Sequence, residues 1–558
     1  MAGIGMKIFE AVSKALEAEK VSTIFGVMGD GNMSLWSTIV ARGTATMVSA
    51  RNEAGAVAMA DGFFRATGRV GVATVTCGPG LTQIGTSLMA AARNRTAMVV
   101  ICGEIPADAV NKLQSMDQRR FVEACSTRYF SITGSSNLAK EIVQAFYVAR
   151  AQSCPVVLNL PNDIQERDFS AAWQYRSSAD LLSDLAPAPS NEDVDMLVDA
   201  VRKARKPLII AGKGARLSGA REEIISLSRR IGALLGTSLQ SKSMFSDDEW
   251  SIGIVGGYSS AVTEEFCREA DLVIGIGAEV GHYTSWGGTL FPQASLIRID
   301  IAQPPVELQA ATGRHISADA RKTLMRLNAG LEQSQVRHEG FRNAETKARI
   351  ATRPMPLPAA KDGIDPRALG RALGSLIPHD ALLTCGVGHF QGFVATYMEL
   401  RPETQVEFSS QFGAVGQTLP VAIGIGMAQP DRPHLVIEGD GSLMMNMQEL
   451  DTAARSKLPM VLLVWNDRGY GAEAQRLPLK GFSPTPAQWE TPDFAAVARA
   501  VGGDGVLLES LDGLGGAMRR GFAKKGLFVI DARVSPSETS DSYRKLYMGQ
   551  PNHAPLVA

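Results

Sequence analysis

The sequence predicts an α/β protein built from three doubly wound parallel-sheet domains. Three stretches of the chain alternate short runs of β-branched residues with longer helical patterns, which is typical of parallel strands covered by helices. The chain has 558 residues, of which 45% are hydrophobic and 20% charged. This length is too great for one core and corresponds to roughly three or four units of about 150 residues.

The first domain is predicted over residues 1–180. Its opening segment, MAGIGMKIFEAVSKALEAEK, has the pattern of an amphipathic helix rather than of a cleavable signal. The expected strands are Val21–Gly26, Gly71–Thr76, Ala97–Cys102 and Pro155–Leu160.

The second domain is predicted over residues 190–332, after a linker from Asp184 to Asp193 that contains APAPSNED. Its expected strands are Pro207–Ala211, Leu272–Gly277 and Leu296–Asp300.

The third domain is predicted over residues 365–535, beyond the polar, proline-bearing stretch from Gln333 to Pro366. Its expected strands are Ala381–Thr384, His434–Glu438, Met460–Trp465 and Leu527–Asp531. The first and third domains are candidates for one architecture used twice. The tail, residues 536–558, is either an active-site lid or a simple chain end.

The composition favours small-molecule chemistry. Because 56 basic residues nearly balance 57 acidic ones, we expect neither a nucleic acid nor a membrane as a partner. The six cysteines form no CxxC pair, and no apolar run approaches the roughly 20 residues that span a bilayer. We therefore expect a soluble, cytoplasmic protein.

Two strands of the third domain end in polar residues that suit a divalent cation. His434–Glu438 runs directly into Gly439-Asp440-Gly441-Ser442, and Met460–Trp465 runs into Asn466. Parallel strands carry their ligands at the carboxyl edge of the sheet, so Asp440 and Asn466 should meet there. With a backbone carbonyl near Arg468 they would offer oxygen ligands to Mg²⁺ and leave positions for a diphosphate. A helix starting near Leu443 would point its positive end at the phosphates. The alternative is an ordinary glycine turn.

The spacing between this GDG motif and Asn466 resembles the thiamine diphosphate (ThDP) signature of the acetolactate synthase, 2-oxo acid decarboxylase and benzaldehyde lyase superfamily. The resemblance implies an N-terminal pyrimidine-binding domain, a central domain, a C-terminal diphosphate-binding domain, and ThDP and Mg²⁺ as cofactors. It implies Asp440, Asn466 and Arg468 at the metal. It also implies these cofactor contacts: Val387, Gly388, His389, Phe390, Gly413, Val415, Gly439, Asp440, Gly441, Ser442, Asn466, Tyr470 and Gly471. In this resemblance Val415 is the bulky apolar residue that holds the cofactor in its bent, V-shaped conformation. The alternative is that Val415 only packs in the hydrophobic core.

Glu53 is the expected activating residue. The segment Arg51-Asn52-Glu53-Ala54-Gly55 resembles the family's activating glutamate and the helix behind it. A carboxyl group bonded to the pyrimidine nitrogen favours the tautomer that removes the thiazolium proton. The family pattern brings Glu53 of one subunit to Asp440 and Asn466 of another, which implies at least a homodimer and favours a tetramer. The alternative is an N-terminal helix charge.

The substrate end is expected to include Asp30, Gly78 and Gln114. Asp30 ends FGVMGD, which resembles the FGVPGD loop of pyruvate decarboxylases, and Gly78 lies in a turn that resembles TSGPG. Leu113-Gln114 resembles the hydrophobic-Gln pair of synthases and lyases. The paired first-domain histidines of the decarboxylases are absent, since the first histidine is His282. Asp30 could instead be a turn residue and Gln114 a surface residue.

Two further loops leave alternatives open. His389 could contact the diphosphate, serve acid-base chemistry or be structural. Leu208–Gly214 resembles a nucleotide-binding turn, so FAD or ADP is the less favoured extra cofactor. Gly277-Ala278-Glu279 lacks the arginine of flavin-binding synthases, which argues against a tightly held flavin.

The expected function is ThDP- and Mg²⁺-dependent decarboxylation of a 2-oxo acid, with carboligation of the enamine to an aldehyde or second oxo acid. The alternatives with the same cofactor are a carbon-carbon bond lyase or hydrolase and a non-ligating 2-oxo acid decarboxylase. The alternative of another class is a non-catalytic ThDP-binding homologue.

Overall fold

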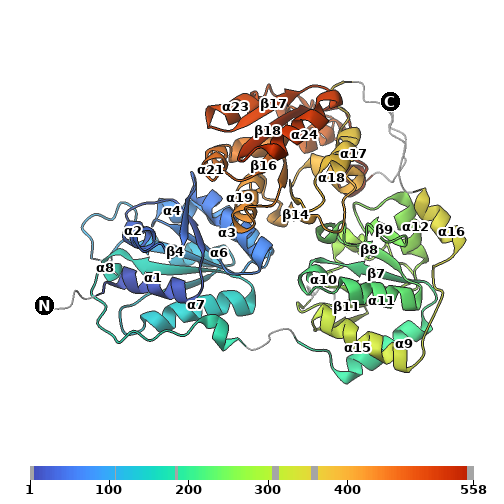
Figure 1. Cartoon of the computed structure of the whole chain (residues 1–558), viewed down its shortest axis with the longest axis horizontal. Helices are drawn as coiled ribbons and strands as arrows, with labels where there is room; N and C mark the ends of the chain where they lie inside the picture. The colour runs from blue at the N-terminus through green and yellow to red at the C-terminus, as the bar shows by residue number, and fades with distance from the viewer. Residues whose placement is uncertain (1–5, 107, 183–186, 304–312, 353–361, 550–558) are drawn as a thin grey trace.

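The computed structural model describes residues 6–106, 108–182, 187–303, 313–352 and 362–549. Within these ranges the chain forms three bodies, each a six-stranded sheet with helices around it (Figure 1). The assigned strand pairs are all parallel, which confirms the predicted fold class. We call these bodies the N-domain, the central domain and the C-domain.

The N-domain sheet has the order β2-β1-β3-β4-β6-β5. Its strands are β1 Thr23–Gly26, β2 Thr46–Ser49, β3 Gly71–Val75, β4 Met98–Glu104, β5 Arg128–Ser131 and β6 Pro155–Pro161. Its helices are α1 Ile8–Ala18, α2 Met33–Arg42, α3 Glu53–Thr67, α4 Pro79–Gln83, α5 Gly85–Arg93, α6 Gln118–Ala124, α7 Leu138–Gln152 and α8 Asn162–Gln165. The expected amphipathic opening segment is α1, which buries Ile8, Val12 and Leu16 on one side.

The C-domain repeats the strand order of the N-domain, as β14-β13-β15-β16-β18-β17. Its strands are β13 Leu382–Gly386, β14 Gln405–Ser409, β15 His434–Gly439, β16 Met460–Asn466, β17 Asp504–Leu508 and β18 Leu527–Arg533. Its helices are α17 Pro366–Leu376, α18 His389–Tyr397, α19 Thr418–Ala428, α20 Asp440–Met445, α21 Glu449–Arg455, α22 Gly471–Arg476, α23 Phe494–Ala500, α24 Leu514–Ala523 and α25 Asp541–Tyr547. The helix expected near Leu443 therefore begins earlier, at Asp440.

The central sheet has a different order, β12-β11-β10-β7-β8-β9, which is that of the dinucleotide-binding fold. Its strands are β7 Pro207–Ala211, β8 Leu234–Thr237, β9 Ser251–Ile254, β10 Leu272–Ile276, β11 Ser295–Ile299 and β12 Arg314–Ile316. Its helices are α9 Asn191–Lys203, α10 Lys213–Leu217, α11 Arg221–Ile231, α12 Ala261–Glu269, α13 His282–Ser285, α15 Ala320–Gln333 and α16 Ala344–Ala351.

The N-domain and C-domain meet through α3 and α19, which lie side by side between the two sheets (Figure 1). Two glycines allow their backbones to touch. A Cβ added to Gly62 of α3 would come within 2.0 Å of the Val421 carbonyl oxygen, and one added to Gly424 of α19 within 1.9 Å of the Met59 carbonyl oxygen. This reciprocal contact fixes one sheet relative to the other, and residues of both domains share one hydrophobic core.

Candidate functional site

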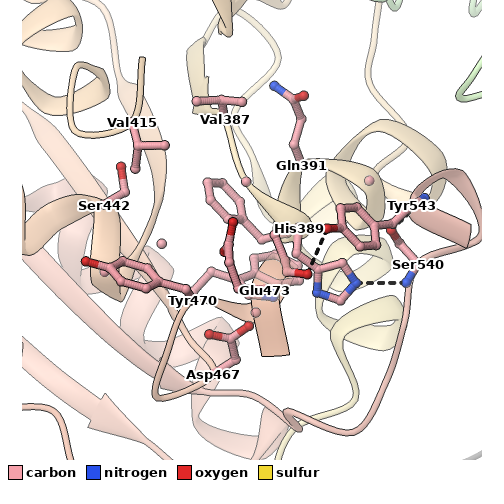
Figure 2. A pocket seen from close by; sticks show the side chains of 18 of the residues that line it. Val387, His389, Gln391, Val415, Ser442, Asp467, Tyr470, Glu473, Ser540 and Tyr543 are labelled. Carbon is pink, nitrogen blue, oxygen red and sulfur yellow. Dashed lines mark hydrogen bonds between the residues drawn. The ribbon is translucent and has the colours of Figure 1, made fainter. Parts of the chain in front are cut away.

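A pocket of about 260 Å³ lies at the carboxyl edge of the C-domain sheet, as expected for a parallel sheet (Figure 2). It is built where β13, β15 and β16 end, and it is closed on one side by the chain end around α25. The lining residues are Tyr258, Val387, Gly388, His389, Phe390, Gln391, Gly392, Val415, Gly439, Asp440, Gly441, Ser442, Trp465, Asp467, Gly469, Tyr470, Gly471, Ala472, Glu473, Arg476, Ser540, Ser542, Tyr543, Leu546 and Tyr547.

Glycines keep this pocket open for a bulky ligand. A Cβ added to Gly439 would come within 3.0 Å of the Phe390 ring, and one added to Gly441 would come within 2.8 Å of the Tyr470 ring. The ring of Tyr470 in turn packs edge-on against Trp489, with 4.5 Å between the ring centroids. The loops therefore approach closely without filling the space between them.

The floor of the pocket carries two neighbouring carboxyl groups, Asp440 and Asp467. The Gly469 N–H donates to Oδ2 of Asp440 at 3.0 Å, and a Cβ on Gly471 would come within 2.1 Å of Oδ2 of Asp467. Burial raises the pKa of both groups, and repulsion from Asp440 raises the pKa of Asp467 further. Two such carboxyl groups share a proton or hold a cation, and their oxygens are the ligands that Mg²⁺ prefers.

Asn466, expected at the metal, points elsewhere. It continues the face of β16 that is buried in the shared core, because side chains alternate along a strand. Its Nδ2 donates to Oδ1 of Asp531 at 2.8 Å and to Oγ1 of Thr491 at 3.1 Å. Asn466 does not line the pocket, whereas the next residue, Asp467, does.

The carbonyl near Arg468 is also engaged outside the pocket. The carbonyl oxygen of Arg468 accepts the Trp489 N–H at 3.1 Å, and its own N–H donates to Oδ1 of Asn466 at 3.2 Å. The residue adopts a φ of 59°, which turns the chain directly after the strand. The next residue, Gly469, is the one that reaches the pocket.

Val415 projects into the pocket from the loop between β14 and α19 (Figure 2). Two hydrogen bonds to Gly416 fix this loop. Oγ of Ser442 accepts the Gly416 N–H at 2.9 Å, and Nδ2 of Asn446 donates to the Gly416 carbonyl at 2.5 Å. Ser442 itself donates to buried Glu438, whose pKa burial raises to about 7. Gly413, which was predicted to contact the cofactor, lies in the same loop but does not line the pocket.

His389 holds the chain end over the pocket (Figure 2). Its Nε2 accepts the Ser540 N–H at 3.0 Å, so the ring is neutral on that side. Burial, with repulsion from Arg544 as a smaller cause, lowers the pKa of His389 to about 4. Of the roles considered for His389, the contacts fit the structural one. The Tyr543 hydroxyl adds a second hold by donating to the Ala472 carbonyl at 2.7 Å.

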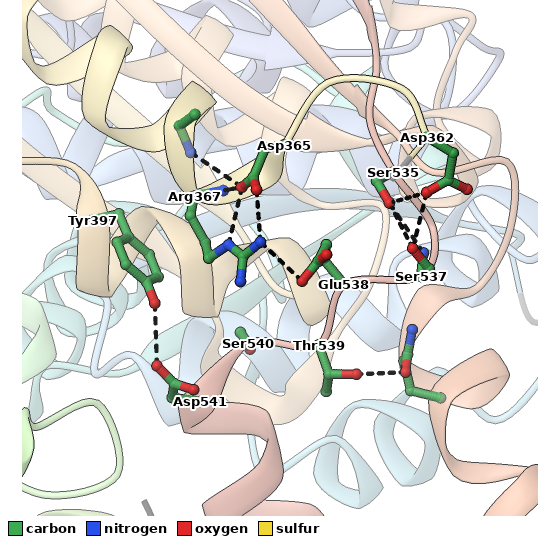
Figure 3. Close-up of polar contacts among 12 residues, drawn as sticks. Asp362, Asp365, Arg367, Tyr397, Ser535, Ser537, Glu538, Thr539, Ser540 and Asp541 are labelled. Carbon is green, nitrogen blue, oxygen red and sulfur yellow. Dashed lines mark hydrogen bonds and ion pairs between the residues drawn. The ribbon is translucent and has the colours of Figure 1, made fainter. Parts of the chain in front are cut away.

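The segment leading to α25 is fastened by polar contacts on several elements (Figure 3). Arg367 bonds Asp365 at 2.6 Å and Glu538 at 3.1 Å. Further contacts join Ser535 and Ser537 to Asp362, Tyr397 to Asp541, Thr539 to Gln475, and Lys545 to Glu264 of the central domain. The segment from Ser535 to Tyr547 therefore lies docked across the pocket, whereas residues 550–558 of the predicted tail lie outside the described residues.

The predicted N-domain residues gather at the carboxyl edge of their own sheet. Asp30, Gly78 and Gln114 lie in the loops after β1, β3 and β4, and Glu53 is the first residue of α3, which follows β2. A Cβ on Gly78 would come within 2.4 Å of the Gln114 carbonyl oxygen. Cys77, beside Gly78, donates its Sγ–H to Oε1 of Gln114 at 3.3 Å.

The loops carrying Asp30 and Glu53 converge on the same turn. A Cβ on Gly29, next to Asp30, would come within 2.8 Å of Thr76, and one on Gly80 within 3.3 Å of Oε1 of Glu53. The two halves of the predicted site nevertheless stay apart in a single chain. Among the described residues that line the C-domain pocket, none belongs to the N-domain.

The nucleotide turn expected in the central domain lies at the switch point between β7 and β10. There the Gly212 N–H donates to the Ile276 carbonyl and the Gly214 N–H to the Gly277 carbonyl, both at 2.9 Å. Lys213 reaches into the N-domain, where its Nζ donates to Oδ1 of Asn94 at 2.8 Å. The loops that follow β7 and β10 thus hydrogen-bond to each other at the position where FAD or ADP was considered as an extra cofactor.

Sequence reasoning missed Asp467, Glu473 and Arg476 as pocket residues, although all three follow β16 closely. The position of Asp467 directly after the strand end is the signal that could have identified it. Ser540 and Tyr543 belong to the tail that was considered as a lid, but nothing in the sequence pattern singled out these two residues within it.

The C-domain pocket lies at the carboxyl edge of a parallel sheet and is framed by acidic residues, glycines and the apolar Val415. This arrangement is typical of cofactor-binding α/β enzymes. Three family models match this chain. The thiamine pyrophosphate enzyme N-terminal TPP binding domain matches residues 6–123, the central domain residues 194–327, and the C-terminal TPP binding domain residues 386–532. The chain belongs to the thiamine pyrophosphate enzyme family.

Curated relatives cover nearly the whole chain. It is 26% identical over 542 residues to the acetolactate synthase large subunit of Haemophilus influenzae, covering 95% of this chain and 94% of that protein. It is 27% identical over 560 residues to the acetolactate synthase of Arthrospira platensis, covering 97% and 96%. It is also 28% identical over 540 residues to a probable 2-ketoarginine decarboxylase of Pseudomonas aeruginosa, covering 94% and 93%.

Among the described residues, no helix is long and apolar enough to cross a membrane.

Proposed function

We propose that this ThDP enzyme decarboxylates a 2-oxo acid with the help of Mg²⁺ and joins the product to a second carbonyl compound. The observation that carries the proposal is that Glu53, Gly78 and Gln114 cluster at the carboxyl edge of the N-domain sheet. The C-domain sheet has a separate pocket at its own carboxyl edge, lined by glycines and two aspartates. The similarity to acetolactate synthases along almost the full chain supports ligation.

In the proposed site Asp440 and Asp467 hold the cation, which neutralises them and allows a diphosphate to lie beside them. When bound, ThDP would supply the carbon nucleophile and the electron sink that decarboxylation of a 2-oxo acid requires. Glu53 holds a proton at the pyrimidine ring of the cofactor, and the neutral amide of Gln114 orients the substrate. The docked chain end around α25 excludes water from the pocket.

The active unit in this proposal is at least a homodimer. Glu53 must lie near the C-domain pocket to activate the cofactor, but no N-domain residue lines that pocket in the described part of one chain. A second subunit that presents its N-domain edge to the pocket would complete each site.

A non-ligating decarboxylase is the second candidate. It is favoured by the similarity to the probable 2-ketoarginine decarboxylase and by two charged side chains in the pocket, Glu473 and Arg476. An acid near the reacting carbon would promote protonation of the product rather than ligation.

Product analysis separates the two candidates. The holoenzyme would be incubated with pyruvate and longer 2-oxo acids, with and without an acceptor aldehyde, and the products identified by mass. A 2-hydroxy ketone or acetohydroxy acid supports ligation, whereas an aldehyde as the sole product from every mixture rejects it.

A Glu53→Gln variant tests the activation step. We expect exchange of the cofactor's C2 proton and turnover to fall by roughly 10²- to 10⁴-fold, the usual contribution of a positioned acid-base group. Glu10→Gln is the matched control, because Glu10 also lies in the first turn of an N-domain helix. Unchanged C2 exchange in the Glu53 variant would show that the role assigned to Glu53 is wrong.

A further inference from the structure

Glu449 is a buried carboxylate of the C-domain that bonds to the N-domain loop leading into Glu53. It is 0% exposed and opens α21. Its Oε1 accepts the N–H groups of Arg51 and Asn52, both at 3.0 Å, while its Oε2 accepts the hydroxyl of Thr452 at 2.7 Å. A carboxylate buried so deeply is stable only with such donors, so the loop and Glu449 depend on each other.

The fit between Glu449 and the first turn of α3 is close. A Cβ added to Gly55 would come within 2.6 Å of Oε1 of Glu449, so the glycine makes room for the carboxylate. Asn52 caps the same helix by accepting the Ala54 N–H at 2.8 Å. Between these two contacts lies Glu53, whose backbone has little freedom to shift.

A continuous set of hydrogen bonds joins Glu449 to the cofactor pocket of its own chain. Ser442 lines the pocket and accepts the Gly416 N–H, and Asn446 donates to the Gly416 carbonyl. The Asn446 carbonyl in turn accepts the Glu449 N–H at 3.0 Å. The pocket wall, Glu449 and the loop before Glu53 thus form one connected unit that crosses the domain boundary.

We propose that Glu449 is a positioning residue that couples occupancy of the C-domain pocket to the placement of Glu53 in the same chain. This inference rests on the proposed function, in which Glu53 of one chain serves the pocket of its partner. Filling one pocket of a dimer would then order the glutamate that acts at the other pocket. Glu449 touches neither cofactor nor substrate in this scheme.

Inorganic diphosphate with Mg²⁺ tests the coupling without any contact to Glu53, because it has no pyrimidine ring. We would measure backbone hydrogen exchange of residues 50–55 in the full-length protein, with and without this probe. The expected result is slower exchange of the Arg51 and Asn52 amides in the wild type when the probe is bound. In Glu449→Gln both amides should exchange at least about tenfold faster, with no response to the probe.

Asp451→Asn is the matched control. Asp451 also lies in α21 and bonds Arg51, but through an exposed ion pair of 2.5 Å rather than through the loop backbone. This variant should keep the response to the probe. If Glu449→Gln does not fold, Glu449→Asp keeps the charge while withdrawing it from the two amides, and it should show the same loss.

A second readout separates positioning from general stability. We expect C2 proton exchange of bound ThDP to fall by roughly 10- to 100-fold in Glu449→Gln, while ThDP affinity stays within a fewfold of the wild type. A drop in affinity with unchanged C2 exchange would overturn the inference.

The coupling and the proposed function fail in different ways. Calorimetry would first establish whether the wild type binds the probe. Binding without any change in exchange at residues 50–55 would overturn the coupling alone. No binding would overturn the diphosphate site, and the coupling with it.

Discussion

His434 is a buried base whose environment keeps it neutral. It is 1% exposed at the start of β15, with its Nε2 2.8 Å from Oγ1 of Thr384. Burial, together with repulsion from Arg432, lowers the pKa of His434 to about 3. An unfolded histidine takes up its proton near pH 6.5, so the unfolded state gains protons first as the pH falls. The stability contributed by neutral His434 is present above about pH 6.5 and is lost as the pH falls towards 3.

We therefore predict that His434→Gln flattens the acid limb of the stability profile. Between pH 7.5 and pH 5 the Tm of the variant should fall less than that of the wild type. The reason is that His434 contributes up to about 1.4 kcal/mol per pH unit to the slope of the unfolding free energy against pH, and the variant lacks this contribution. Differential scanning fluorimetry at a series of pH values provides the measurement. His282→Gln, at an exposed position, should keep the wild-type slope.

The neighbours Asn466 and Asp467 should separate into one structural and one metal-binding residue. We predict that Asp467→Ala weakens Mg²⁺ binding in the presence of ThDP by the order of 10- to 100-fold. Asn466→Ala should instead lower the Tm, because Asp531 and Thr491 lose their partner at a cost of about 1–3 kcal/mol. Calorimetric Mg²⁺ titration and thermal melting distinguish the two, and the reverse pattern would contradict the placement of Asp467.

These two residues also show where sequence reasoning ends at the atomic scale. The motif located the strand end correctly, and its Asp440 lines the pocket. It could not tell whether residue 466 or 467 lines the pocket. That choice depends on the alternation of β16 and on Asp531, a partner far away in the chain.

At the scale of elements, the α3–α19 crossing depends on the absence of side chains at two points. We predict that Gly62→Ala lowers the Tm, because its Cβ would meet the Val421 carbonyl at 2.0 Å and force the helices apart at a cost of about 1–3 kcal/mol. Gly516→Ala is the control, as this α24 glycine has nothing within 4 Å of an added Cβ. It should raise stability by about 0.5–1 kcal/mol. Equal effects of the two alanines would contradict the close crossing.

The strands that the sequence predicted are those in the middle of the sheets. All eleven expected strands are present within a few residues, including β4, β7 and β16. The missed strands are β8 and the six at the sheet edges, namely β2, β5, β9, β12, β14 and β17. Interior strands are covered on both faces and read as continuous apolar runs, whereas edge strands such as β5, with its partly exposed RYFS, do not.

At the scale of the whole molecule, α25 joins the C-domain to the central domain beside the pocket. Lys545 of α25 bonds Glu264 of α12, and both side chains are almost fully buried. Leu546 packs where a Cβ on Gly257 would come within 2.5 Å. The pocket therefore has walls from two domains and a cover from α25.

We predict that a chain truncated after Ser540 releases ThDP at least about tenfold faster than the wild type, which corresponds to the loss of about 1.4 kcal/mol of closure. A chain truncated after Gly549 keeps α25 and should release the cofactor at the wild-type rate. Stopped-flow displacement after cofactor loading measures both rates. Equal release from both truncated chains would show that α25 does not retain the cofactor.

The shared strand order of the N-domain and C-domain explains why the sequence placed candidate residues at two separate sheet edges. In both sheets the candidate loops follow strand ends at the carboxyl edge, as at Asp30 and Gln114 in the N-domain and at Val387 and Asp440 in the C-domain. How the two edges are placed relative to each other depends on packing between the sheets, for which the sequence contains no local signal, and the proposed dimer would bring them together.

The position of α25 has a consequence for biosynthesis. Ribosomes make the chain from its N-terminus, and domains fold in that order as they emerge. The three sheets are complete by Arg533, whereas the cover of the pocket comes after them. Because α25 follows the last strand, we expect the cover to dock only on a finished C-domain sheet, so that cofactor arriving before this docking would meet an open pocket.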